Sequence, residues 1–174
     1  MAIFDLGRTE RATKAAGKLL EKALKEELEL QGHVGTGALL NSIKSKVEKE
    51  EGFPQIVVDA LDYALDLNAK RHPNPTTSVS VIYDWLKTKK IGLDSSTLDG
   101  LGNLTRISIA IASTIAKEGS PTKGSKRFSK APDKRRTGFI DLTVEAKVNT
   151  ITNIIEDALG KDYLAHMEKE IKKK

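Results

Sequence analysis

The chain contains no cysteine, which excludes disulfide bonds, thiolate metal sites and a cysteine nucleophile within its 174 residues. Aromatic residues make up only 5% of it, so the core must be built from aliphatic side chains. The longest apolar run, "ISIAIASTIA", is about half as long as a segment that crosses a bilayer. The N-terminus also lacks the basic and apolar regions of a signal peptide. We therefore expect a soluble protein of cytosolic origin that does not enter a membrane.

The sequence also lacks the side-chain patterns of known catalytic and metal sites. His33, His72 and His166 lie far apart, and no two of them have metal-ligand spacing. Asp62 and Asp66 are four residues apart and can share a helix face, but no histidine accompanies them. There is no G-x-S-x-G motif and no G-x-G-x-x-G motif after a strand. We therefore expect no enzyme activity, no catalytic residue, no metal site and no cofactor.

Three glycines in "GHVGTG" have the spacing of a phosphate-binding loop, beginning at Gly32 and ending at Gly37. Such a loop continues with a lysine that reaches the phosphates and a hydroxyl residue that holds magnesium. Here Ala38 and Leu39 stand in those places, and no apolar strand precedes the glycines. The stretch is interpreted as a turn between a helix and a strand, with no nucleotide involved.

The length is sufficient for one domain with a core, and we expect residues 1–174 to form a single domain. The net charge of +5 is concentrated in residues 119–138, the basic segment, which has seven cations and one acid, a net charge of +6. Its Gly, Ser and Pro content predicts a flexible arm. Three roles stay open for it: contact with nucleic acid, docking on an acidic protein, or a solvated loop. The cations are Lys123, Lys126, Arg127, Lys130, Lys134, Arg135 and Arg136.

Hydrophobic periodicity predicts the secondary structure. Residues 9–31 are expected to form a helix that Thr9 caps and Gly32 ends. Two strands, in 42–50 and 55–61, are expected to form an antiparallel hairpin whose loop exceeds two residues. Further helices are expected in 62–70, 77–90, 104–119 and from 139 onward, and the helix in 104–119 should be the most buried of them. For residues 148–155 a strand is left open as the alternative to a helix. Gly160 should break or kink the last helix.

With these elements in order, four short motifs resemble those of the tail-completion or head–tail joining (neck) proteins of tailed bacteriophages. The first begins a strand, the second follows the hairpin, and the other two lie on helices. They fall on Thr36, Gly37, Leu39, Ser42 and Ile43; on Tyr63 and Ala64; on Trp85, Lys89 and Ile91; and on Ile111, Ala112, Ile115 and Gly119. The resemblance covers most of the chain.

The resemblance implies an α+β fold, in which a small antiparallel sheet is packed by long N-terminal, central and C-terminal helices. It implies a structural virion protein that forms a homo-oligomeric ring, of six or twelve subunits, between the head and the tail. The partners would be the portal or adaptor and the tail-tube or tail-terminator proteins, in the virion neck after assembly in the host cytoplasm. The basic segment would order in the ring, against a neighbouring virion protein or facing packaged DNA. The alternative is a small nucleic-acid-binding protein that uses the basic segment.

Overall fold

The computed structural model describes residues 5–34, 36–69, 73, 78–89 and 101–173. It has an α+β fold, as expected, in which a two-stranded antiparallel sheet lies against long helices. The elements are α1 (Gly7–Leu30), α2 (Ala38–Ser42), β1 (Lys44–Glu50), β2 (Phe53–Asp59), α3 (Tyr63–Asn68), α4 (Val79–Lys89), α5 (Leu101–Glu118), the 3-10 helix η1 (Lys123–Phe128) and α6 (Phe139–Ile171). None of the described helices is both long and apolar enough to cross a membrane.

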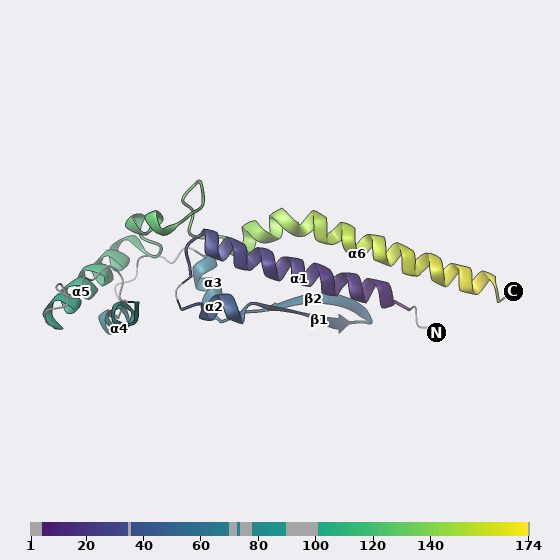
Figure 1. Ribbon diagram of the computed structural model, residues 1–174, viewed down its shortest axis with the longest axis horizontal. Helices are drawn as coiled ribbons and strands as arrows, with labels where there is room; N and C mark the ends of the chain where they lie inside the picture. The colour runs from purple at the N-terminus through teal and green to yellow at the C-terminus, as the bar shows by residue number, and fades with distance from the viewer. Residues whose placement is uncertain (1–4, 35, 70–72, 74–77, 90–100, 174) are drawn as a thin grey trace.

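Helix α1 is the central element, because both α6 and the β1–β2 hairpin pack against it (Figure 1). Helix α6 runs antiparallel to α1. Its start lies near the end of α1, and its residue Asp162 reaches Thr9 in the first turn of α1. The core of this body joins α1, α2, α3 and α6, and consists of Leu24, Leu28, Leu39, Ile43, Ala64 and Phe139.

The hairpin joins its strands through a two-residue turn, so the expected longer loop was wrong. Glu51 and Gly52 have φ values of 51° and 89°, and Glu50 stands directly opposite Phe53. Positive φ at both central residues is typical of a type I′ turn, whose twist matches that of the strands. Ser45 and Val47 are half-buried and alternate with exposed charged residues, as the sequence pattern predicted.

Helices α4 and α5 pack on each other around a second hydrophobic cluster, away from the hairpin (Figure 1). The expected apolar face of α5 is confirmed, with Leu104, Ile107 and Ile111 in the contact with α4. The expectation that this helix is the most buried was wrong, because Ile109 is 52% exposed. Helix α4 covers only one face of α5, although apolar residues lie almost all the way round α5.

Helix α6 continues unbroken through Gly160, contrary to the expected break. A single glycine inside a helix costs about 1 kcal/mol relative to alanine, too little to end a helix that pairs with α1 on both sides of it. The β-branched stretch from 148 to 155 is helical as well, which settles the alternative that the sequence left open.

The two ends of α1 also differ from one another in how well the sequence predicted them. Gly32 ends the helix with φ +72°, and its N–H donates to the Glu29 carbonyl at 3.0 Å while that of His33 donates to Leu28 at 3.1 Å. These two hydrogen bonds are the pattern typical of a glycine C-cap, as expected. Thr9 is not the N-cap: the helix begins at Gly7, and the buried Thr9 hydroxyl donates to Asp162 instead.

Candidate functional site

The basic segment forms a folded connection between α5 and α6, where the sequence suggested a flexible arm. Its first half contains η1, and its second half lies against the end of α1. The Leu30 carbonyl accepts backbone hydrogen bonds from Lys130 at 2.8 Å and Ala131 at 3.2 Å. The Ser129 hydroxyl donates to the Arg135 carbonyl at 2.7 Å, which closes the turn between them. The bonds from Lys130 and Ala131 thus tie the segment to the Leu30 carbonyl, one of those that the last turn of α1 leaves without an intrahelical partner.

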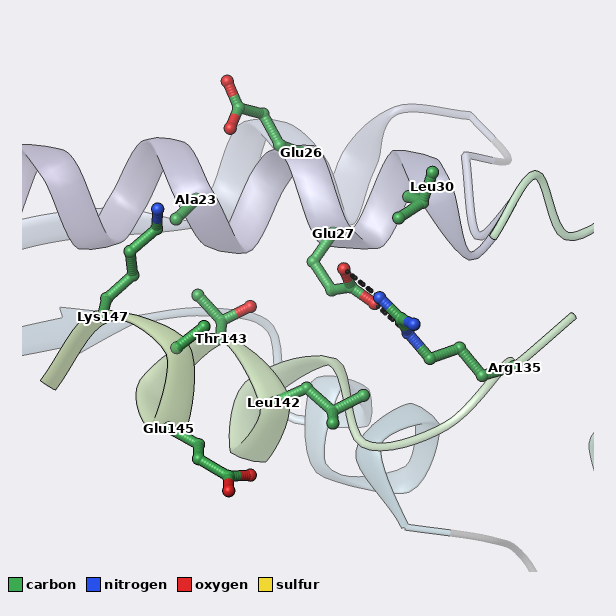
Figure 2. A pocket seen from close by; sticks show the side chains of 10 residues that line it. Ala23, Glu26, Glu27, Leu30, Arg135, Leu142, Thr143, Glu145 and Lys147 are labelled. Carbon is green, nitrogen blue, oxygen red and sulfur yellow. Dashed lines mark hydrogen bonds and ion pairs between the residues drawn. The ribbon is translucent and has the colours of Figure 1, made fainter. Parts of the chain in front are cut away.

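Arg135 forms a bidentate ion pair with Glu27 of α1, so this cation stabilises the fold. Its Nε and Nη2 donate to Glu27 Oε1 at 2.8 Å and Oε2 at 3.0 Å (Figure 2). Its Nη1 also donates to Asp133 at 3.2 Å. The hydrogen bond from Arg135 lowers the pKa of the Glu27 carboxyl, and the one to Glu27 raises the pKa of Arg135. This cation therefore serves the α1–α6 junction.

Arg136 and His33 form a second, half-buried contact at the same end of α1. Arg136 Nη1 donates to the Ser125 carbonyl at 2.9 Å, and its Nη2 lies 3.3 Å from His33 Nδ1. His33 Nε2 is 2.9 Å from the Arg136 carbonyl. The neutral histidine that carries its proton on Nε2 satisfies both contacts. Burial lowers the pKa of His33 and also that of Arg136.

Of the other cations in the basic segment, one bonds within the fold and four are exposed to solvent. Lys134 donates from Nζ to the Ser129 carbonyl at 3.2 Å. Lys123, Lys126, Arg127 and Lys130 have exposed side chains on and beside η1, and we call these four residues the basic patch. The Arg127 guanidinium lies 4.8 Å from the centre of the Phe128 ring, which is also exposed. The basic patch is thus the part of the segment that is open to a partner.

A groove of about 620 Å³ separates the end of α1 from the start of α6. Figure 2 shows Glu27 and Arg135 facing each other across it, whereas Glu26 and Glu145 point away from one another. Several of the side chains that line the groove are small or apolar. The carboxylate that points into it, that of Glu27, is bound by Arg135, so the groove offers no acid–base pair. The lining residues are Ala23, Glu26, Glu27, Leu30, Arg135, Leu142, Thr143, Glu145, Ala146 and Lys147.

A second hollow, of about 240 Å³, brings together residues of three of the family-like motifs. Thr36, Gly37 and Leu39 line it from the α2 side, with Tyr63 of α3 and Trp85 of α4. Trp85 and Tyr63 are 46% and 44% exposed. The hollow therefore has an aromatic rim at the place where α4 comes near α2 and α3.

The other motif residues lie beneath or away from this hollow. Ile43 and Ala64 are in the core, and the Ser42 hydroxyl accepts the N–H of Leu61 at 3.2 Å. Ala112 belongs to the α4–α5 cluster, with Ile111 and Ile115 packed against it. Ile91, the side chain of Lys89, and His72 lie outside the part of the chain that the structure describes.

The helix pattern predicted the pairing of Glu21 with Lys25, which is confirmed, but sequence reasoning missed the contact of Glu21 with the hairpin and the pairing of Glu27 with Arg135. Glu21 is buried at the hairpin, where it accepts the Ser45 N–H at 2.8 Å and binds Lys18 and Lys25. The bond from Lys18, followed by that from Lys25, lowers the pKa of Glu21 far below its usual range. A signal for Glu27 was present, because it continues the spacing of Ala16, Leu20 and Ala23 on the face toward α6.

In the described part of the chain, no three His, Cys, Asp or Glu residues gather as a metal site. What the structure defines is an α+β chain with a basic patch, an aromatic-rimmed hollow and a groove between its long helices. Comparisons of the chain with protein-family models, with curated proteins and with solved structures found no match.

Proposed function

We propose that the chain is a structural virion protein of a tailed bacteriophage: a tail-completion or neck component that forms a ring joining the head to the tail. The observation that carries the proposal is the hollow where Thr36, Gly37, Leu39, Tyr63 and Trp85 meet. These residues carry the resemblance in sequence and come from segments up to about fifty positions apart. Their meeting supports a shared structural role for the motifs.

The surface of α6 supports a role in assembly. Val144 and Val148 lie one turn apart on the same side of the helix and are 43% and 46% exposed, whereas Leu164 and Ile171, nearer its end, are more exposed still and lie on another side of it. Apolar side chains on successive turns of one helix are typical of a surface that another protein covers. A subunit that works through contacts with its copies and neighbours has such surfaces and needs no catalytic group.

The proposal is tested by the mass of the purified chain at high concentration, from light scattering after size exclusion, with negative-stain images of large species. A closed ring of six or twelve copies supports it. Val148→Glu should abolish the ring, because it places a charge on the exposed apolar surface that Val144 and Val148 form; Glu145→Gln, one turn away, is the control. A chain that never exceeds a dimer, alone or with purified portal rings, would contradict the proposal.

The basic patch favours the second candidate, a nucleic-acid-binding protein. Its four exposed cations can each neutralise a phosphate, and the exposed Phe128 can stack on a base. Binding to short duplex DNA should then weaken with salt, with a log–log slope of about −3 to −4. Glutamine at Lys123, Lys126, Arg127 and Lys130 should abolish binding, whereas glutamine at Lys169, Lys172 and Lys173 should leave most of it. Equal loss in both variants would contradict a specific site.

A further inference from the structure

The two edges of the hairpin differ in their chemistry. Strand β1 has five charged residues among its seven, and charged side chains on an edge strand oppose pairing with another chain. Strand β2, "FPQIVVD", has a single charge, at Asp59, and a central run of Ile56, Val57 and Val58. By composition, β2 is the edge that can accept a further strand.

The turn determines which backbone groups of β2 point outward. Glu50 and Phe53 flank a two-residue turn and form a hydrogen-bonded pair, after which bonded and non-bonded pairs alternate along the hairpin. Ser45 and Val58 form a non-bonded pair, and the Ser45 N–H accordingly points outward, to Glu21 Oε2. The same alternation directs the N–H and C=O groups of Ile56 and Val58 away from β1.

The outer edges of the two strands are also occupied differently. Glu21 covers the β1 edge at Ser45. At β2, no backbone hydrogen bond from another described segment reaches Ile56 or Val58, and the elements that pack extensively on this strand are β1 and α1. The donors and acceptors of the β2 edge are therefore arranged for a strand that the described part of the chain does not supply.

We propose that β2 pairs antiparallel with β2 of a second copy, around a twofold axis at Val57. Ile56 then exchanges both backbone hydrogen bonds with Val58 of the second copy, and Val58 with Ile56. The result is a four-stranded sheet, in the order β1, β2, β2 of the second copy and β1 of the second copy. At the next bonded pair, the outward Pro54 carbonyl accepts the N–H of Ala60 of the second copy; because proline has no N–H, the reciprocal bond is absent and the pairing ends there.

Complementarity between the side chains selects a second copy as the occupant. In this register the exposed Phe53 stands opposite Leu61, also exposed, and Gln55 stands opposite Asp59 as donor to acceptor. Val57 meets itself. Shifting one strand by two residues places Val57 opposite Asp59 or Gln55, which pairs an apolar side chain with a polar one. The outer face of β2 is thus self-complementary about Val57.

This pairing does not depend on the proposed neck function, because a twofold contact forms whether or not a ring is built. It also predicts a species, a dimer, that differs in mass from a ring of six or twelve. The two proposals therefore fail separately.

Single cysteines test the register, because the chain has none of its own. Val57 faces its copy in a non-hydrogen-bonded pair, where the Cα atoms are about 4.5 Å apart, within the range that a disulfide spans. Val57→Cys should therefore form a cross-linked dimer under mild oxidation. Gln55→Cys or Asp59→Cys alone should give at least about tenfold less cross-linked dimer, since position 55 of one copy lies opposite position 59 of the other and not opposite itself. A mixture of these two variants should recover the cross-link.

The unmodified interface is tested by sedimentation equilibrium of the full chain. Val57→Lys places two positive charges opposite each other and should give a monomer, while Val57→Thr keeps a β-branched neutral side chain and should stay dimeric. Equal cross-linking at 55, 57 and 59 would overturn the proposal, because it indicates random collisions. So would a dimer that Val57→Lys leaves intact, or a wild-type monomer that binds only extended peptides of unrelated sequence.

Discussion

The two ends of α1 are fixed by different means. At its N-terminal end the helix has no side-chain cap of its own, and one carboxylate from α6 takes this role: Asp162 accepts the N–H groups of Arg8 at 3.0 Å and Thr9 at 2.8 Å. Its C-terminal end is held by the positive φ of Gly32 and by several hydrogen bonds to the basic segment. The first turn of α1 thus depends mainly on Asp162, with Asp5 accepting only the Gly7 N–H at 3.1 Å, and the other end depends on a turn and a distributed set of contacts.

The largest effect is expected at Gly32. A Cβ there would lie 2.1 Å from the Phe128 carbonyl oxygen, and the residue has φ +72°. Gly32→Ala combines the cost of positive φ, about 1–2 kcal/mol, with that of overpacking, about 1–3 kcal/mol. We expect a loss of about 3 kcal/mol in the free energy of unfolding, measured by denaturant titration. Gly52→Ala is the matched control, because φ there is +89° with nothing near; it should lose only about 1 kcal/mol. Equal losses would refute the close approach.

A smaller loss is expected when the α6 carboxylate at the other end of α1, that of Asp162, is removed. Asp162→Ala leaves the part-buried N–H of Arg8 and the buried N–H of Thr9 without their acceptor, which should cost about 2 kcal/mol. Asp157→Ala is the control, since Asp157 is exposed and pairs only with Lys161 in a surface ion pair; its change should stay within about 0.5 kcal/mol. Hydrogen exchange should locate the effect of Asp162→Ala in the first turn of α1, and exchange that is unchanged there would contradict the capping role.

The ion pair between Glu27 and Arg135 should contribute less than the Asp162 cap. Both side chains are only partly shielded, at 13% and 31% exposure. We expect a coupling energy of about 1–2 kcal/mol from a double-mutant cycle with Glu27→Gln and Arg135→Gln. Lys22 and Glu26, an exposed pair in α1, provide the control cycle and should give about 0.3 kcal/mol. Coupling of equal size in the two cycles would show that Arg135 is solvated like a surface residue.

This comparison also shows what the sequence could and could not predict. Local signals were sufficient for the Gly32 end, the strand alternation and the contact face of α5, because glycine conformation and hydrophobic period are properties of neighbouring residues. The turn at Glu51 was missed because a non-glycine residue adopts positive φ there. The cap by Asp162 depends on a residue about 150 positions away, and no local pattern indicates it.

The basic segment illustrates the same limit. Its charge and composition predicted a flexible arm, whereas the segment is folded, with the side chains of the basic patch exposed on it. Arg135 and Arg136 are drawn inward by Glu27 and His33, which belong to the other long helix and the residues just after it. Charge can be counted from the sequence, but the partner that engages a given arginine is decided by the antiparallel pairing of α1 with α6.

The smallest effect distinguishes the two ends by the pH at which each weakens. Burial is the main cause that lowers the pKa of His33 below its usual 6.5, and the charge of Arg136 adds to it, against the hydrogen bond with the Arg136 carbonyl. Between the folded and unfolded pKa values the unfolded chain binds more protons, so stability is complete above about pH 6.5 and declines as the pH falls toward the folded value. For Asp162, burial raises the pKa, but the hydrogen bonds from Thr9 and Arg8 outweigh it and lower the pKa below the usual 3.8; its contribution is lost only in acid.

Denaturation midpoints measured from pH 8 to pH 3 should therefore separate the variants. His33→Asn should flatten the profile between about pH 7 and 5 and leave the acid limb unchanged, because it removes an imidazole whose pKa is lowered by burial on folding. Asp162→Asn should flatten only the acid limb. If His33→Asn keeps the full slope of the wild type near neutrality, the histidine does not titrate differently on folding, and the C-terminal end of α1 is held by Gly32 and Arg135 without it.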